Sequence, residues 1–250
     1  MDFSEQRYAH APIVEAVLDL RVNFEGEVSP TGLQAFADLW KAETPIIENL
    51  NFLSMGIHAQ PDLGGSLSIT QDQHFLGLGL RDLEKKFMVQ ARQDGFAFIN
   101  VGEYPGWVKF EAHARVWWDR YMSAFPVKGV KRAALRYINR IEIPSLNVEP
   151  EDYFNVYLKV PSEGCLKDVV GFNIQATFPQ NDIQATALVQ QALAQPTKLK
   201  HLAIMLDVDL FSDLDRPADN TLWDYFSLLR SRKNTIFEDA ITKRTRELIK

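Results

Sequence analysis

Residues Leu135 to Pro144, near the middle of the chain, have the sequence LRYINRIEIP. Apolar residues occupy most alternate positions, which is the pattern of a β-strand with one buried face. Asn139 stands on the apolar side, where an unpaired amide costs about 1–3 kcal/mol. We therefore expect Asn139 to bond backbone groups, for example at a helix end, and to have a structural role. Arg136 and Arg140 lie on the opposite, open side of the strand.

The same alternation occurs near the N-terminus, over residues 13–24. The apolar side of this predicted strand carries Val14, Ala16, Leu18, Leu20, Val22 and Phe24. Glu15, Asp19 and Arg21 lie on the other side. The two stretches are therefore expected to be corresponding strands, each with one buried and one polar face.

The first of these strands begins a long series of predicted elements. A helix runs from Ser29-Pro30 to Pro45, because serine is a good N-cap and proline a good first helical residue. Strands follow over residues 50–58, 66–70, 75–81, 85–92 and 96–101, and a helix with an aromatic stripe covers 107–125. Turns are expected around Asp62, Gly64 and Gly65, at residues 71–74, and at Asp94-Gly95, which is a strong hairpin signal.

A similar series begins with the strand over residues 131–143. It continues with a short helix over 149–158, a hairpin of strands over 168–178 and 183–193, and a strand over 199–211. A C-terminal helix begins near Asp219 or Asn220 and ends with basic residues, which the helix dipole favours at that end.

The repeated order predicts an α+β fold, a pseudo-duplicated antiparallel sheet with its helices on one face. Residues 1–126 form the first repeat and 127–250 the second, and no linker composition separates them, so one body of 250 residues is expected. The element order resembles the two-repeat, saddle-like topology of the TATA-binding protein. No sequence match accompanies it, so this analogy concerns the fold alone.

Four segments together resemble a known family. They are PIVEAVLDLRV at Pro12 to Val22, LRYINRIEIP at Leu135 to Pro144, LDVDLF at Leu206 to Phe211 and KNTIFEDAIT at Lys233 to Thr242. In this order they are similar to a sporadically distributed family of uncharacterised prokaryotic proteins, with PIVEAV, LRYINRI, LDxD and C-terminal NxxFExxIT motifs, over nearly the whole chain. The sequence departs from that pattern at Arg230, where a histidine often stands. The resemblance implies no activity, cofactor or catalytic residue.

The composition excludes several classes of protein. With 46% hydrophobic residues the chain is rich enough for a substantial core, and its single cysteine, Cys165, excludes an internal disulfide framework. No apolar run reaches the roughly 18 residues of a membrane helix, and the start of the chain has no signal-like apolar segment, so we expect a cytoplasmic protein. The formal charge of −6 disfavours wholesale polyanion binding. Residues 126–250 carry 17 basic against 16 acidic residues, compared with 10 against 17 in residues 1–125, so an anion would prefer the second half.

We interpret the open face of the sheet as the candidate working surface. By alternation it carries Glu15, Arg21, Arg136, Arg140, Asp207, Asp209 and Gln175, together with Asp19, Arg132 and Glu142. One interpretation is a solvated face whose ion pairs are each worth about 0.2–1 kcal/mol. The other is a platform whose mixed charges orient a protein partner or a small polar ligand. The second is our leading hypothesis, a non-enzymatic binding or regulatory protein, and self-association stays an open alternative.

An enzyme acting on a phosphorylated or nucleotide-like small molecule is the first alternative. Arg136 and Arg140 would hold the anion, and the Asp-x-Asp pair of Asp207 and Asp209 would hold a divalent metal. A salt bridge to either arginine explains the pair as well. No catalytic fingerprint is found, so we assign no catalytic residue, metal or cofactor. Nucleic-acid binding through the second half is the second alternative, which the net charge disfavours.

Two further groups have ordinary interpretations that we prefer. Trp107, Trp117 and Trp118 are expected in the interface between helix and sheet. Arg230, Arg232 and Lys233 are expected on a solvated helix face, with contact to phosphate groups as the alternative.

Overall fold

A computed structural model describes residues 8–59, 67–161, 163–165, 169–213 and 215–250, without the side chains of residues 52–59 and 67–73. Its strands are β1 (Ile13–Phe24), β2 (Ile46–Ala59), β3 (Leu67–Arg81), β4 (Phe87–Arg92), β5 (Gly95–Val101), β6 (Val127–Ile143), β7 (Asn173–Gln180), β8 (Ala185–Ala194) and β9 (Leu202–Ser212). Its α-helices are α1 (Pro30–Leu39), α2 (Trp107–Ala124), α3 (Thr221–Ala240) and α4 (Lys243–Leu248). Two 3-10 turns are η1 (Pro150–Asp152) and η2 (Asn181–Ile183).

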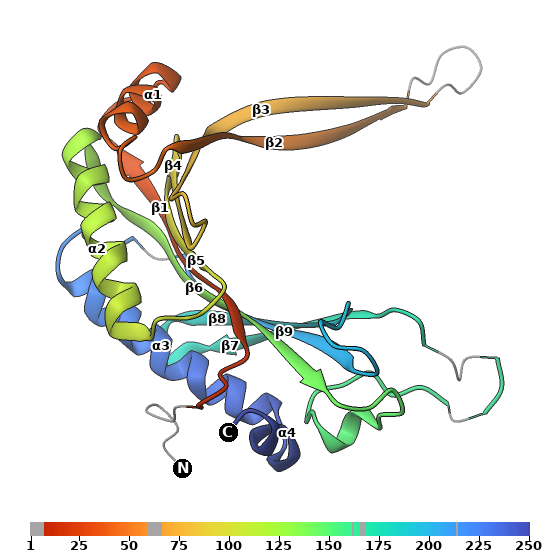
Figure 1. Cartoon of the computed structure of the whole chain (residues 1–250). Coiled ribbons are helices and arrows are strands. Elements are labelled where there is room, and N and C mark those ends of the chain that lie inside the picture. Colours follow the sequence, from red (N-terminus) through yellow and green to blue (C-terminus); the bar gives the residue numbers. More distant parts are fainter. Residues whose placement is uncertain (1–7, 60–66, 162, 166–168, 214) are drawn as a thin grey trace.

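In the described part of the chain, nine strands form one antiparallel sheet in the order β2-β3-β4-β5-β1-β6-β9-β8-β7. The strands that begin the two halves, β1 and β6, lie side by side at its centre, with Val17 opposite Arg136 and Leu18 opposite Leu135. The α+β class and the antiparallel sheet predicted from the sequence are therefore confirmed. The sheet is curved, and α2 and α3 lie along its convex side (Figure 1).

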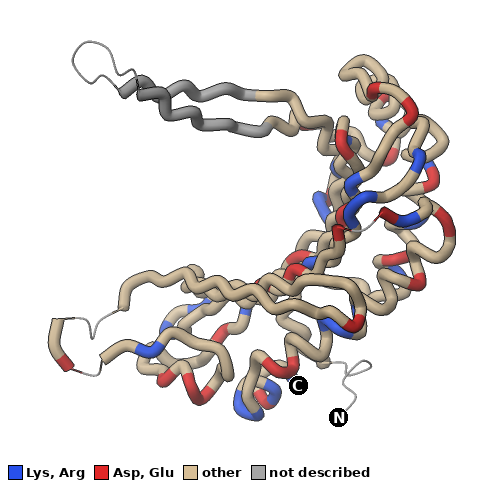
Figure 2. Tube along the Cα trace, turned by 180° about the vertical axis from the view of Figure 1, so that it is seen from behind, with Lys and Arg blue, Asp and Glu red and all other residues tan. Residues whose placement is uncertain are grey.

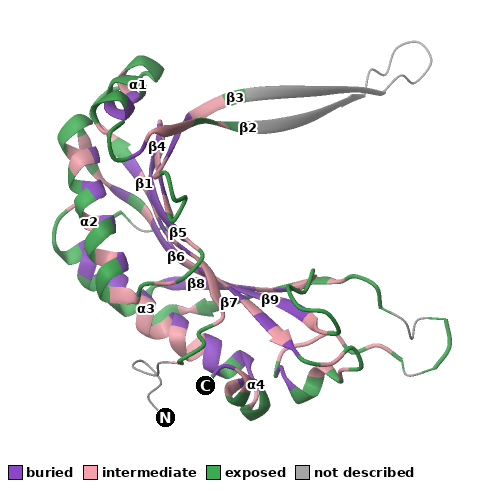
Figure 3. Ribbon diagram, viewed as in Figure 1, coloured by how far each residue is buried: buried purple, intermediate pink, exposed green. Residues whose placement is uncertain are grey.

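The alternation of β1 separates a buried face from a polar one, as expected. Ala16, Leu18 and Leu20 have no exposed surface, whereas the intervening residues are partly exposed. Leu135, Tyr137 and Asn139 continue the buried face on β6, and the buried segments of the central strands are visible in Figure 3. Each core leucine stabilises the fold by about 1.5–3 kcal/mol through the apolar surface it removes from water.

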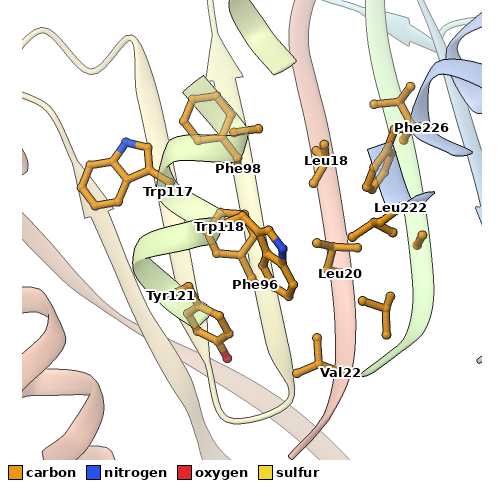
Figure 4. Close-up of a cluster of buried hydrophobic side chains, with 14 of the residues drawn as sticks. Leu18, Leu20, Val22, Phe96, Phe98, Trp117, Trp118, Tyr121, Leu222 and Phe226 are labelled. Atoms are coloured by element: carbon orange, nitrogen blue, oxygen red, sulfur yellow. The ribbon is translucent and has the colours of Figure 1, made fainter. Parts of the chain in front are cut away.

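An aromatic cluster joins α2 to this buried face. Phe96 on β5 packs against Trp118, with ring centroids 5.5 Å apart, and Trp118 stacks on Tyr121 at 5.8 Å (Figure 4). Leu222 and Phe226 of α3 pack into the same cluster. The helix-side positions expected for Trp117 and Trp118 are thus confirmed. One core contains side chains from both halves of the chain.

The helix ends follow local chemistry. Ser29 is the N-cap of α1, and its hydroxyl accepts a hydrogen bond from the Gly32 amide at 3.1 Å. Helix α2 ends at Ala124 because Phe125 precedes Pro126 and adopts an extended conformation. Helix α3 ends at Ala240, where Ile241 becomes extended, so the basic C-terminal residues belong to the separate helix α4 rather than to α3.

Several predicted boundaries are wrong. No turn occurs at residues 71–74, because β3 continues from Leu67 to Arg81 and pairs with β2 over its length. The turn expected at Asp62, Gly64 and Gly65 lies outside the described residues. Only η1 forms where a helix over 149–158 was predicted, because Phe154 makes a β-bridge to Ile241 that ends the turn. Among the described residues, no helix combines the length and apolar composition needed to cross a bilayer.

Candidate functional site

The open face of the sheet has its charged side chains concentrated on the central strands. Glu15, Asp19 and Arg21 project from β1, and their neighbours on β6 and β5 are fixed by the antiparallel register. Figure 2 shows basic and acidic residues intermingled along these strands. Their ion pairs, which we call the open-face network, comprise a connected set of Asp19, Arg21, Arg92, Asp94, Arg132, Asp209 and Asp213 and a separate pair of Arg136 and Asp207.

Arg136 and Asp207 form the closest pair. The guanidinium Nε of Arg136 donates to Asp207 Oδ1 at 2.9 Å, and Nη2 donates to Oδ2 at 2.5 Å, a two-pronged geometry. Asp207 is only 12% exposed at its side chain. The hydrogen bonds that Arg136 donates to Asp207 outweigh the burial of the guanidinium and raise the pKa of Arg136. A salt bridge from the Asp-x-Asp pair to Arg136 or Arg140 was the alternative to a metal site, and the structure shows it between Asp207 and Arg136.

Asp19 is the centre of the other pairs. Arg92 Nη2 lies 2.7 Å from its carboxylate, Arg132 lies at 3.4 Å and Arg21 at 3.5 Å. Arg21 also donates to Asp94. The burial of Arg21 and the repulsion from Arg92 lower the pKa of Arg21, so this side of the network is crowded with cations.

Asp209 has the least compensated carboxyl group of the network. Its Oδ1 is buried and has no hydrogen-bond donor among the described residues, and its pair with Arg132 is 3.8 Å long. Burial raises the pKa of Asp209 to about 6, since the attraction of Arg132 and Arg136 is too weak to offset it. At neutral pH this carboxylate is charged and can still accept a donor.

Arg140 and Glu142 extend the polar surface along β6. Arg140 Nε is buried without an acceptor, and Glu142 Oε2 is buried without a donor, among the described residues. The other carboxylate oxygen of Glu142 accepts from the amide and the hydroxyl of Thr197, both at 2.8 Å. Arg140 thus has a donor available on the same face as Asp209.

Gln175 lies apart from the charged network. It is exposed on β7 opposite Gln190, which uses its amide to donate to Asn173 at 2.9 Å. The structure therefore links Arg21 to Asp209 through Asp19 and Arg132, places the Arg136–Asp207 pair on the same face, and leaves Gln175 outside the network. Glu15 lies beside the network, close enough to raise the pKa of Arg136 together with the two aspartates, the effect of Asp207 being the largest.

Asn139 has the backbone contacts expected of it, but not at a helix end. Its side-chain amide donates to the carbonyl of Leu206 at 3.0 Å, across the β6–β9 pair. A metal at the Asp-x-Asp pair is not supported by this geometry, because Arg136 occupies both oxygens of Asp207. The described residues contain no group of three His, Cys, Asp or Glu side chains arranged to hold a metal ion.

Three network members, Arg92, Asp94 and Asp213, were not among the residues predicted on the open face. Arg92 is 4% exposed at its side chain and lies on the open face because its neighbour Ala91 faces the core. Strand alternation alone would have placed Arg92 there. Asp94 lies in a hairpin turn, where alternation gives no information.

Lys233 was predicted on a solvated helix face, and that prediction is wrong. The residue is only 7% exposed, and it extends the spacing of the buried residues Leu222, Phe226 and Leu229 along α3. That periodicity was the signal that could have placed it.

Neither protein-family models nor curated proteins give a match to this chain.

Proposed function

We propose that this chain is a non-enzymatic binding or regulatory protein that uses the open-face network, together with Arg140 on the same face, to hold a protein partner or a small polar ligand. The observation that carries the proposal is the pair of uncompensated groups on one face. Asp209 Oδ1 and Arg140 Nε are buried but lack hydrogen-bond partners among the described residues. Unsatisfied buried groups cost about 1–3 kcal/mol each. A partner that supplies one donor and one acceptor would remove that cost on binding.

The rigid surroundings support the same proposal. Arg136 and Asp207 are held together by two-pronged hydrogen bonds, and Arg92 is almost fully buried beside Asp19. Charges that are already fixed in position lose little conformational freedom when a partner binds. Mixed charge also selects orientation, because a misplaced partner meets like charges.

The experiment compares a double variant with a matched control. Asp209→Asn with Arg140→Gln removes one negative and one positive charge from the open face. Glu25→Gln with Lys128→Gln does the same at an exposed ion pair 3.7 Å long, with side chains 76% and 60% exposed. Each protein is immobilised, exposed to a native prokaryotic lysate and washed, and the retained proteins and small molecules are identified by mass spectrometry.

The proposal is supported when a molecule retained by the wild type and the control is lost from the double variant. Recovery of the same molecules by all three proteins, each shown to be folded by circular dichroism, contradicts it.

An enzyme acting on a phosphorylated small molecule is the weaker proposal. Arg140 has an open donor for an anion, but Asp207 would have to release Arg136 before it could bind a metal. A thermal-shift screen with Mg²⁺ and nucleotides distinguishes the two, because a ligand at 100 times its dissociation constant stabilises a protein by about 2.7 kcal/mol. A shift that requires both metal and nucleotide would favour the enzyme.

We further propose that the two halves are structural repeats of one saddle-shaped body in a prokaryotic cytoplasmic protein. The strand order supports this, since β5, β4 and β3 lie outward from β1 while β9, β8 and β7 lie outward from β6. Helices α2 and α3 then follow β5 and β9 in the chain. Residues 1–126 and 127–250 would be the repeats, with the topological analogy to the TATA-binding protein restricted to the fold.

A further inference from the structure

A pocket of about 470 Å³ lies on the helix-covered side of the sheet, away from the open-face network. It is formed by the start of α2, the middle of α3, the segment before β1 and the buried face of β6. Tyr137 and Asn139 of β6 line it. The segment from Leu135 to Pro144 therefore contributes to two different surfaces: Arg136 and Arg140 lie on the open face, whereas Tyr137 and Asn139 line the pocket.

The charged residues around the pocket are mainly basic. Lys109, Arg230 and Lys233 line it, and Glu238 is the acidic residue among the described lining positions. Glu238 is already engaged, because Arg246 Nε donates to it at 2.7 Å and the Tyr8 hydroxyl donates at 2.6 Å. Among the described residues, three cations therefore line the pocket against one carboxylate, which is already paired.

Lys233 is the most buried of the three cations that line the pocket. It is 7% exposed, and its Nζ lies 3.6 Å from the centre of the Tyr137 ring. This cation–π contact is the only attractive interaction of its ammonium group among the described residues, and such contacts are worth about 2 kcal/mol when desolvated. Burial, followed by repulsion from Arg230, lowers the pKa of Lys233 to about 7.

The N-terminus of α2 faces the same pocket. Gly106, Trp107, Val108 and Lys109 all line it. Helix α2 has 18 residues, no side chain caps it, and its first turn contains no acidic residue. The first amide groups of a helix lack intrahelical acceptors, and together with the helix dipole they favour an anion. Gly106 has a φ of +88°, a conformation that favours glycine, so the backbone turns here without a side chain that could cap the helix.

Aromatic groups supply an apolar wall beside these cations. The hydroxyl groups of Tyr104 and Tyr137 are hydrogen bonded at 2.7 Å, which leaves their rings to line the pocket. The guanidinium carbon of Arg230 lies 5.8 Å from the centre of the Trp107 ring. Ligand pockets of about 300–1,000 Å³ commonly combine apolar walls with a few placed polar groups.

We propose that this pocket binds a small phosphate monoester with a planar or aromatic body. Its phosphate lies at the N-terminus of α2 within reach of Lys233 and Arg230, and its body packs against Trp107 and Tyr104. Three cations and an uncapped helix end match a dianion better than a single carboxylate. The site is independent of the open-face network, because it lies on the opposite side of the sheet.

Isothermal titration calorimetry of the full chain with phenyl phosphate tests the proposal, with inorganic phosphate and benzoate as companions at one ionic strength. Phenyl phosphate is expected to bind at one site, about tenfold or more tighter than benzoate, because a charge-assisted hydrogen bond is worth about 1.5–3 kcal/mol and 1.4 kcal/mol is tenfold. Absence of binding, or benzoate binding as tightly as phenyl phosphate, overturns the proposal.

Variants locate the site. Arg230→Gln should weaken phenyl phosphate at least about tenfold. Arg232→Gln is the matched control on the same helix, because Arg232 pairs with Asp182 and does not line this pocket. Equal weakening by both variants would mean that phenyl phosphate binds elsewhere and would overturn the assignment.

Chemical trapping gives a readout at Lys233 itself. Pyridoxal phosphate is an aromatic phosphate monoester with an aldehyde, which condenses with the neutral lysine amine and releases water. Borohydride then reduces the imine to a stable secondary amine. Peptide mapping should find Lys233 modified, and excess phenyl phosphate should protect it. Modification confined to other lysines, or no protection, would contradict the proposal.

Discussion

Replacing Asp209 by asparagine is expected to stabilise the protein at neutral pH. The pKa of this carboxyl rises from its ordinary value of 3.8 to about 6, chiefly because the group is buried. Each tenfold change in proton affinity is worth 1.36 kcal/mol, so the ionised carboxylate destabilises the fold by about 3 kcal/mol, to an order of magnitude. The side chain is 20% exposed, so solvent reduces this cost only in part.

The pH dependence follows from the sign of the shift. The folded protein binds the proton more tightly than the unfolded chain between pH 3.8 and about 6, so the free energy of unfolding falls as the pH rises through this interval. Above about pH 6 the ionised carboxylate destabilises the fold to its full extent, and below pH 3.8 this destabilisation is absent. Asparagine is neutral throughout, so its advantage should appear only as the pH rises.

Urea denaturation at several pH values between 4 and 8 measures this difference. At about pH 7.5 we expect Asp209→Asn to raise the free energy of unfolding by about 1–3 kcal/mol, which corresponds to a Tm increase of about 2–12 °C for a chain of this size. Asp213→Asn is the matched control, because Asp213 also lies beside Arg132 but is 65% exposed. A gain independent of pH, or no gain at neutral pH, would refute the electrostatic reasoning. If Asp209→Asn is more stable than the wild type but no longer retains the molecule that the wild type binds, the carboxylate of Asp209 serves binding at the expense of stability.

The remaining predictions concern the core, the network and the pocket. Leu18→Ala should destabilise the protein by about 2–5 kcal/mol in urea denaturation, because Leu18 is fully buried; Leu39→Ala, at a position 73% exposed, should change stability by less than about 0.5 kcal/mol. Arg136→Gln should cost about 1–3 kcal/mol, because Asp207 loses its charged partner, and an unchanged midpoint would contradict that pairing. Lys233→Met should stabilise the fold most below about pH 7, where the folded protein still has to bury the charge, and the gain should shrink towards pH 10.5. A gain for Lys233→Met that grows with pH would reverse this argument.

The sequence by itself determined which residues of the central strands face the core. Side chains alternate across a strand with a period of two, so the pattern from Ala16 to Leu20 and from Leu135 to Ile143 was enough to separate the two faces. The start of α1 and the end of α2 were likewise predictable, because Ser29 and Pro126 act through neighbouring backbone groups. These features depend on contacts within a few residues.

Only the tertiary structure decided which charges meet. Arg136 pairs with Asp207, 71 residues away, and not with Asp209 directly opposite it, because the strand register and the direction of the long side chain select a diagonal neighbour. The pocket around Lys233 depends in the same way on α2 and α3 meeting over β6. Local periodicity can assign a residue to a face, but the identity of its partners depends on the strand order and helix packing, which are set by contacts between distant parts of the chain.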